Sequence, residues 1–194
     1  MKAMATVLLF TAVACAQARP EQGGHELSLW TGGGPSVANR FNDDGVWNVN
    51  LRYGWVLTRP HGSGILSGRF EYAVDATPLY LVFQRTTVYG GGFTPAVLKW
   101  NFATRGRIVP FGDIEGGVLF TRSDVPAGTS SVNFTPGASA GVHILREKNN
   151  ISFSVRYGHI SNAGLSRYNP GINTVQFTVG IGRFTNGESH KKKP

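Results

Sequence analysis

The stretch "VWNVNLRYGWVLT", from Val46 to Thr58, alternates between apolar and polar side chains along its whole length. One set of alternate positions holds Trp47, Val49, Leu51, Tyr53, Trp55 and Leu57. The other set holds Asn48, Asn50, Arg52 and Gly54. Successive side chains of a β-strand point to opposite faces, so this pattern predicts a strand with one apolar and one polar face.

The same alternation recurs along most of the chain and predicts about eight strands. The further segments are 65–75, 95–102, 108–121, 132–144, 151–157 and 173–184, with a weaker first strand at 25–30. A soluble sandwich alternates too, but here the polar faces repeatedly carry charges. Strands of about 9–11 residues with an apolar outer face and a charged inner face are typical of membrane barrels. We therefore predict an all-β fold, an eight-stranded antiparallel transmembrane β-barrel.

The inner faces of the predicted strands bring acidic and basic groups together in a narrow lumen. These groups are Glu71, Asp113 and Glu115, with Arg52, Arg69, Lys99 and Arg156. Paired carboxylates can form an acid–base site, but the nearby cations favour a structural ion network. A barrel of about eight strands is just wide enough for side chains to fill, so we expect no diffusion pore.

The N-terminal stretch "MKAMATVLLFTAVACAQARP" has one lysine, an apolar core and small residues at Ala16 and Ala18. This layout predicts a secretory signal peptide over residues 1–18, followed by the barrel at 19–184. A lipoprotein signal that ends at Cys15 is the alternative, although position 12 is alanine rather than leucine. The last segment, 185–194, carries "HKKKP" and is interpreted as a basic disordered tail.

The net charge of the 194-residue chain is +8, and most of it is scattered. Such a charge suits nucleic acid or an acidic lipid surface, but export argues against nucleic acid. The histidines at 25, 61, 143 and 190 lack metal-ligand spacing, and the only cysteine lies in the signal. "FNDDG" (Asn42, Asp43 and Asp44) lacks the later acidic ligands of a calcium loop and is interpreted as an exposed turn. We expect neither a metal nor a cofactor.

The predicted connections alternate between short turns and longer loops, the latter at 31–45, 76–94 and 122–131. Outer-membrane barrels have short periplasmic turns and long outer loops, so both termini should be periplasmic. The clusters "TGGGPS" and "YGGGFTP" fall in the predicted outer loops. They lack the strand and helix of a nucleotide site, and we interpret them as turns.

The stretch "YGHISNAGLSRYNPGIN", residues 157–173, follows one of the predicted strands. His159 and Ser161 share the parity of the apolar face that ends at Tyr157, so a regular strand turns both towards lipid. A histidine on such a face is commonly structural. However, positions i and i+2 lie about 7 Å apart at Cα, which permits a Ser–His pair. An esterase would also need a group that orients the imidazole and an oxyanion donor.

The run "RYGHISNAGLSRYNPGIN", with the strand after it, resembles the PagL-type lipid A 3-O-deacylases, a family of eight-stranded outer-membrane barrels also called acyloxyacyl hydrolases. The resemblance implies an esterase of the bacterial outer membrane that removes an ester-linked acyl chain from the lipid A of lipopolysaccharide. It implies that His159 is the general base, that Ser161 is the nucleophile and that Asn162 contributes to the oxyanion site. Whether the barrel forms a homodimer is left open.

One position departs from the family pattern. Where established members carry a glutamate that orients the histidine, this sequence has Asn173. An asparagine can fix the tautomer of an imidazole but cannot stabilise the imidazolium by charge. Three alternatives follow: a slow esterase, an enzyme that uses Asp124 from a neighbouring loop, or a non-catalytic barrel that binds lipopolysaccharide or has a structural role. Candidate contacts for the lipid A phosphates are Arg40, Arg85, Arg122 and Arg167.

Overall fold

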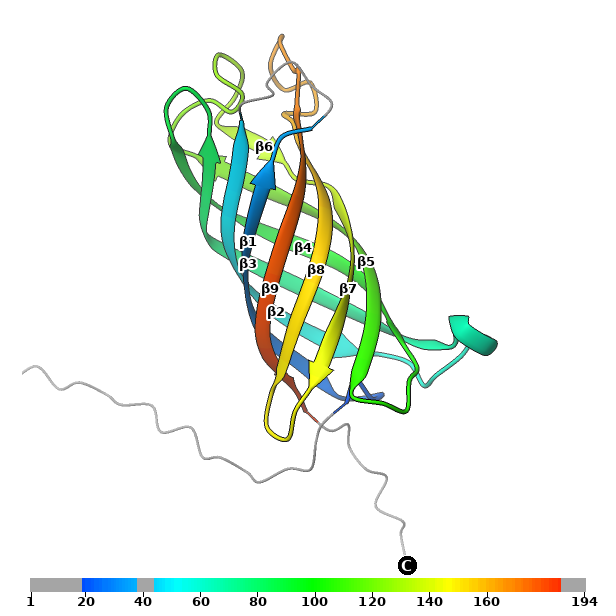
Figure 1. Cartoon of the computed structure of the whole chain (residues 1–194). Helices are drawn as coiled ribbons and strands as arrows, with labels where there is room; N and C mark the ends of the chain where they lie inside the picture. The colour runs from blue at the N-terminus through cyan, green and yellow to red at the C-terminus, as the bar shows by residue number, and fades with distance from the viewer. Residues whose placement is uncertain (1–18, 38–43, 186–194) are drawn as a thin grey trace, which may run out of the picture.

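The computed structural model describes residues 19–37 and 44–185. The predicted signal peptide and all but the first residue of the predicted tail lie outside this part of the chain. The strands run between a rim of loops and the opposite end, where the first and last described residues lie (Figure 1). They are β1 (His25–Pro35), β2 (Gly45–Val56), β3 (Gly68–Phe83), β4 (Val88–Phe102), β5 (Ile108–Thr121), β6 (Val132–Phe134), β7 (Gly137–Leu145), β8 (Asn150–Ile160) and β9 (Ile172–Phe184), with a short 3-10 helix η1 (Gly64–Leu66) before β3.

The sheet closes on itself, because β1 pairs with β9 and β4 pairs with β5. Strands β6 and β7 both pair with β5 and together make one crossing of the wall. The strand is interrupted between them at Thr135 and Pro136, because proline has no N–H to donate to the ladder. Pairing continues around the break: the Thr135 N–H donates to the Gly117 oxygen (2.8 Å) and the His159 N–H to the Pro136 oxygen (2.9 Å). The predicted eight-stranded antiparallel barrel is confirmed.

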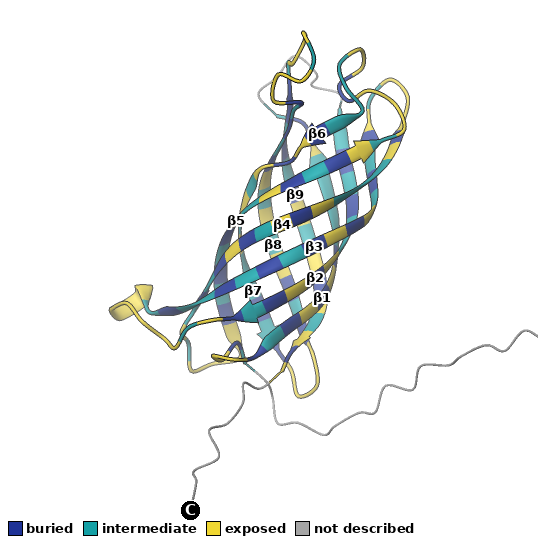
Figure 2. Ribbon diagram, turned by 180° about the vertical axis from the view of Figure 1, so that it is seen from behind, coloured by how far each residue is buried: buried dark blue, intermediate teal, exposed yellow. Residues whose placement is uncertain are grey.

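The outward-facing side chains are apolar and exposed. Leu51, Phe153 and Phe177 expose 49%, 48% and 68% of their surface. Figure 2 shows the resulting alternation of buried and exposed positions along the strands. A barrel with a paired backbone and an apolar outer face suits a lipid bilayer. In the part of the chain that the structure describes, no helix is long and apolar enough to span a membrane.

Charged side chains fill the middle of the lumen. A guanidinium nitrogen of Arg52, Nη2, lies 2.8 Å from Oδ2 of Asp75, and its Nη1 lies 3.3 Å from Oδ2 of Asp113. Arg156 pairs with Glu115, which also lies 3.5 Å from Arg52. The predicted structural ion network is therefore confirmed, and Asp75 belongs to it.

A second cluster of charges surrounds Lys99, whose side chain is fully buried. Its Nζ pairs with Glu26 and lies 3.5 Å from Oε2 of Glu71. Nδ2 of Asn101 donates to the same Glu71 oxygen at 2.6 Å. Glu26 is an additional member of the network, and it lies in the strand with the weakest sequence pattern.

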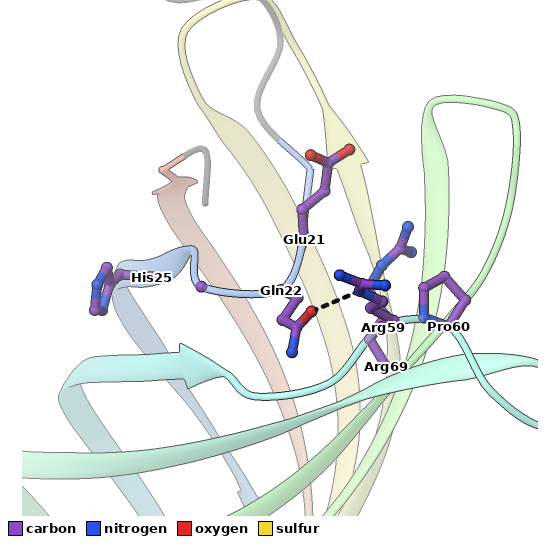
Figure 3. Close-up of a pocket in the computed structure, with 7 residues that line it drawn as sticks. Glu21, Gln22, His25, Arg59, Pro60 and Arg69 are labelled. Carbon is purple, nitrogen blue, oxygen red and sulfur yellow. Dashed lines mark hydrogen bonds between the residues drawn. The ribbon is translucent and has the colours of Figure 1, made fainter. Parts of the chain in front are cut away.

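Arg69 is not part of this network, contrary to the prediction. It lines a pocket of about 730 Å³ at the end of the barrel opposite the loop rim, together with Glu21, Gln22 and Arg59. Figure 3 shows Arg59 and Arg69 beside each other, with Nε of Arg59 donating to Oε1 of Gln22 at 3.1 Å. Because β3 begins at Gly68, Arg69 stands at the mouth of the lumen and does not reach the carboxylates in the middle.

Apolar clusters close the lumen on either side of the charged layer. The cluster at the loop end consists of Val46, Tyr80, Val82, Val88, Leu119, Val125, Ile160 and Ile172. The cluster at the other end consists of Val109, Leu145 and Phe184. The lumen is thus filled by side chains, as expected for a barrel of this size.

Both glycine clusters that we predicted as turns in outer loops lie in strands, one in β1 and one in β4. Glycine is needed there because neighbouring backbones approach closely. A Cβ on Gly33 would lie 2.1 Å from the Val46 oxygen, and one on Gly92 would lie 2.6 Å from the Val118 oxygen. These glycines serve strand packing, and their interpretation as turns was wrong.

The prediction of a loop at 76–94 is also wrong, because only the turn 84–87 lies between β3 and β4. Pro78 is accommodated inside β3 because the register with β4 shifts between Thr77 and Tyr80, so no regular ladder bond is lost. The first outer loop shortens to residues 36–44, whereas the predicted loop 122–131 is confirmed.

We expect Lys99→Ala to lower the free energy of unfolding by about 3–5 kcal/mol, because it leaves Glu26 and Glu71 buried without their cation. The measurement is urea unfolding of the barrel refolded in lipid vesicles. Lys148→Ala, in the exposed turn after β7, is the matched control and should change the value by less than about 0.5 kcal/mol. Equal effects of the two substitutions would contradict a stabilising role of the lumenal network.

Candidate active site on the barrel wall

The residues singled out in the sequence lie at the rim of loops, where β8 ends and β9 begins (Figure 1). The connection, residues 161–171, leaves the barrel wall at Ser161 and returns at Ile172. The first and last described residues lie at the opposite end of the barrel. A site here is therefore built from two paired strands and one loop.

His159 and Asn173 lie directly opposite each other in the β8–β9 ladder. The ladder shows no register shift, so both continue the outward face that contains Tyr157 and Val175. Nδ1 of His159 lies 2.7 Å from Oδ1 of Asn173. The structure thus brings together two of the predicted site residues, from positions fourteen residues apart.

This hydrogen bond fixes the tautomer of the imidazole. The amide oxygen of Asn173 can only accept, so the shared proton is on Nδ1 of His159. In the neutral ring, Nε2 then keeps its lone pair and can accept a proton from a hydroxyl group. A neutral histidine in this tautomer is what a general base requires.

Ser161 follows two positions after His159 on the same face. Its backbone pairs with Phe134 of β6 in both directions, through bonds of 2.7 and 3.1 Å. The half-buried serine is therefore held on the wall and not in the free part of the loop. Among the hydrogen bonds of residues 19–37 and 44–185, none joins the Ser161 hydroxyl to His159.

Asn162 has the opposite parity, and its side chain is fully buried. Its Nδ2 donates to the Tyr168 oxygen at 3.0 Å, and its Oδ1 accepts from the Gly164 N–H at 2.9 Å. Its own N–H donates to Oδ1 of Asn169 at 3.0 Å. Asn162 therefore holds the conformation of the loop after Ser161. Its contribution to an oxyanion site stays a prediction.

Gly171 touches the imidazole and was not identified from the sequence. Its φ is +66°, and a Cβ built on it would lie 2.7 Å from Cε1 of His159. Glycine is therefore required twice, for the backbone conformation and for the space that the ring occupies. The Pro170–Gly171 pair indicates a turn in the sequence, but only the fold places that turn against His159.

Buried apolar side chains lie behind the site, on the lumen side of the wall. Ile160 and Ile172 point inwards, between the outward-facing site residues, and both are almost fully buried in the apolar cluster at the loop end. They pair directly across the β8–β9 ladder. Close packing inside the barrel therefore holds the backbone that carries His159 and Asn173.

The predicted phosphate contacts have separate positions. Arg85, Arg122 and Arg167 are exposed in three different connections at the loop rim, and Arg40 lies outside the described residues. Asp124 is in the loop 122–131, where its backbone oxygen accepts from Nε2 of Gln84 at 3.0 Å. No hydrogen bond in the described part of the chain joins Asp124 to His159.

Metal ligands are not grouped in the parts of the chain that the structure describes, where no cluster of three or more His, Cys, Asp or Glu could hold an ion. Of the suggested calcium turn, Asp44 is described, whereas Asn42 and Asp43 are not. The chemistry available on the wall is that of a serine, a histidine and an amide.

We expect Gly171→Ala to displace the His159 ring and break its bond to Asn173, as measured from the imidazole ¹⁵N chemical shifts of the folded barrel. Gly164→Ala is the matched control, because its φ is +85° but nothing lies within 4 Å of its Cβ position. Both substitutions carry the cost of a positive φ, about 1 kcal/mol. Only the first should change the His159 signals, and identical spectra would contradict the contact.

Comparison with known proteins agrees with this arrangement. The family model described as lipid A 3-O-deacylase (PagL) matches residues 43–182, which include the whole site. The crystal structure of the outer membrane enzyme PagL is similar with a TM-score of 0.57 and 24% identity, covering 80% of this chain and 97% of that chain. Among curated proteins, no sequence matches the chain.

Two further solved structures share the fold. OprG from Pseudomonas aeruginosa is similar with a TM-score of 0.54 and 10% identity, covering 86% of this chain and 98% of that one. Neisserial surface protein A has a TM-score of 0.52 and 13% identity, with 84% and 97% covered. At these identities the likeness concerns the barrel fold, and it agrees with the predicted location in the outer membrane.

Proposed function

The chain belongs to the PagL family of lipid A 3-O-deacylases, and from this premise we propose that it is an outer-membrane esterase that removes an ester-linked acyl chain from lipid A. The observation that carries the proposal is the hydrogen bond of 2.7 Å between His159 and Asn173 on the outward face, two positions from Ser161. This hydrogen bond holds the imidazole in the tautomer that a general base requires. Here the free Nε2 is the atom that must accept the serine proton.

The reaction proceeds in two acyl transfers. Oγ of Ser161 attacks the ester carbonyl carbon, and its proton passes to Nε2 of His159. The same proton then goes to the departing sugar oxygen as the bond between the acyl carbon and that oxygen breaks. A water molecule, deprotonated by Nε2, hydrolyses the acyl-enzyme and releases the fatty acid, and the serine recovers its proton.

The negative oxygen of each tetrahedral intermediate needs hydrogen-bond donors. Close to Ser161, the N–H groups of Asn162 and Gly164 already donate within the loop, so the proposed backbone donor is the N–H of Ala163. Asn162 shapes this loop through its bonds to Tyr168 and Gly164. We assign Asn162 to the oxyanion site through that effect on the loop. Donors held in place before the reaction are worth about 10²–10³ in rate.

The position of the site explains its substrate class. Apolar side chains with exposed surface surround it, among them Phe134, Tyr157, Leu165 and Tyr168. An acyl chain in the outer leaflet can therefore approach the barrel wall from the side, without leaving the bilayer. Lipopolysaccharide is accordingly the proposed partner, with exposed arginines of the rim as contacts for its phosphates.

Ser161→Ala and His159→Ala should each abolish deacylation, with a loss of about 10⁴-fold or more. The measurement is mass spectrometry of lipid A from cells that express each form at equal levels of heat-modifiable, folded barrel. Ser154→Ala, in the lumen on the same strand, is the control and should retain activity. If the folded wild-type protein releases no acyl chain, the esterase proposal fails.

Asn173→Asp should raise the rate about tenfold, because the new carboxylate keeps the shape of the side chain and stabilises the imidazolium by charge. Asn173→Glu tests the residue type of the family in the same way, whereas Asn173→Leu should lower the rate by removing the acceptor. Asn149→Asp, in an exposed turn at the other end, controls for the added charge. Unchanged rates for both acidic variants would show that another residue limits the reaction.

Asn173 also favours a second candidate function, a non-catalytic barrel of the same family that binds lipopolysaccharide. A neutral partner gives the histidine no charge stabilisation, and this barrel would keep the fold and the apolar rim while releasing no fatty acid. The same lipid A mass spectrum decides between the two, since only the esterase shortens the lipid.

A further inference from the structure

A groove of about 660 Å³ lies on the outer wall near the loop rim, on a different part of the barrel from His159. It is lined by Pro78, Leu79, Tyr89, Gly90, Gly91, Phe120, Thr121 and Arg122, from β3, β4 and β5 with the start of the following loop. Tyr89 and Phe120 contribute exposed side chains on its lipid-facing side.

The floor of the groove is Gly91, which stands between the exposed side chains of Tyr89 and Phe93 on the outward face. Its neighbours Gly90 and Gly92 face inwards, where a Cβ would lie 2.5 and 2.6 Å from backbone oxygens of β5. At Gly91 the nearest atom would be 3.1 Å away, so strand packing constrains this position less severely. The missing side chain leaves the hollow between Leu79 and Phe120.

The groove continues the surface that carries Ser161. At the rim, Ser161 bridges to Phe134, which pairs with Val118 of β5. Two residues further along β5, Phe120 pairs with Gly91. Because neighbouring strands are about 4.8 Å apart, the groove lies roughly 10–15 Å around the wall from Ser161. The intervening surface is apolar.

Positive charge stands at the outer end of the groove. Arg122 lines it and is exposed, and its backbone N–H donates to the Tyr89 oxygen at 2.9 Å. Gln84 reaches the backbone oxygen of Asp124 at 3.0 Å, which joins the turn that carries Arg85 to the loop that follows Arg122. None of the ion pairs among the described residues involves either arginine.

We propose that this groove holds a second acyl chain of the lipid whose ester is cleaved at Ser161, and that Arg122 binds a phosphate of the same molecule. The inference rests on the proposed function, because lipid A carries several acyl chains and phosphates on one sugar unit. Leu79 and Phe120 offer apolar contact to the acyl chain. The guanidinium of Arg122 binds a phosphate on the head group of the same lipid. The site thus recognises a multiply acylated, phosphorylated lipid and not an isolated ester.

The test fills the groove with Gly91→Leu and measures equilibrium binding of purified lipid A to the folded full-length protein in detergent micelles. All forms carry Ser161→Ala, so that no hydrolysis occurs. We expect Gly91→Leu and Arg122→Gln each to weaken binding by roughly tenfold. Leu79→Trp narrows the same groove, and it replaces Gly91→Leu in the binding measurement if that variant does not fold.

Two variants are matched controls. Gly116→Leu also adds a side chain to an outward glycine, in open space lower on β5, and Arg183→Gln removes an exposed arginine at the opposite end. Both should bind lipid A as the parent does. Unchanged binding by the groove variants would overturn the proposal, and so would equal weakening for phosphatidylglycerol, which would indicate a general lipid groove.

Hydrolysis separates this proposal from the esterase function. With Ser161 intact, Gly91→Leu should raise the apparent KM for lipid A while kcat and the hydrolysis of a single-chain p-nitrophenyl ester stay unchanged. If the wild type cleaves neither substrate, the esterase proposal fails while the binding measurement still decides the groove. If the wild type cleaves lipid A and Gly91→Leu matches it in both KM and binding, the groove proposal alone fails.

Discussion

The β1–β9 and β4–β5 pairs close the ladder of the described strands, and this closure fixes which way each side chain points. A backbone in hydrocarbon must satisfy its polar groups internally, and a closed antiparallel ladder does so. Once the ladder is regular, alternate residues must face lipid or lumen. The charges of Arg52 and Lys99 meet carboxylates inside because the outer positions are unavailable to them. The same rule turns His159 outwards.

Parity also explains why the partner of the histidine comes from position 173. The carboxylates of the lumen lie on the other side of a wall whose inner surface behind the site is Ile160 and Ile172. An orienting group must come from an outward position on a paired strand, and the position opposite His159 is Asn173. A carboxylate there would lose hydration beside the lipid when the histidine is neutral. Asparagine avoids that cost but gives up charge stabilisation of the imidazolium.

The sequence was sufficient for the parts of the structure that obey a period of two. It predicted the barrel, the outward face of Val46–Thr58 and the lumenal network, since each depends on local alternation. It failed where one residue type has two physical uses: Gly33 and Gly92 permit close strand contact in β1 and β4, yet glycine clusters also indicate turns. The contact of Gly171 with His159 depends on how a loop folds back, which no local pattern contains.

Separate layers of the barrel carry stability and chemistry. The ion network occupies the middle of the lumen, whereas the histidine and its partner stand on the outside near the rim. The apolar cluster at the loop end lies between these layers, because Ile160 and Ile172 fill the lumen and alternate with the residues of the site. A substitution in the charged layer should therefore change mainly the free energy of unfolding. A change in the apolar cluster alters the spacing of His159 and Asn173 directly, since the ladder that joins them is the one whose inner face it supports.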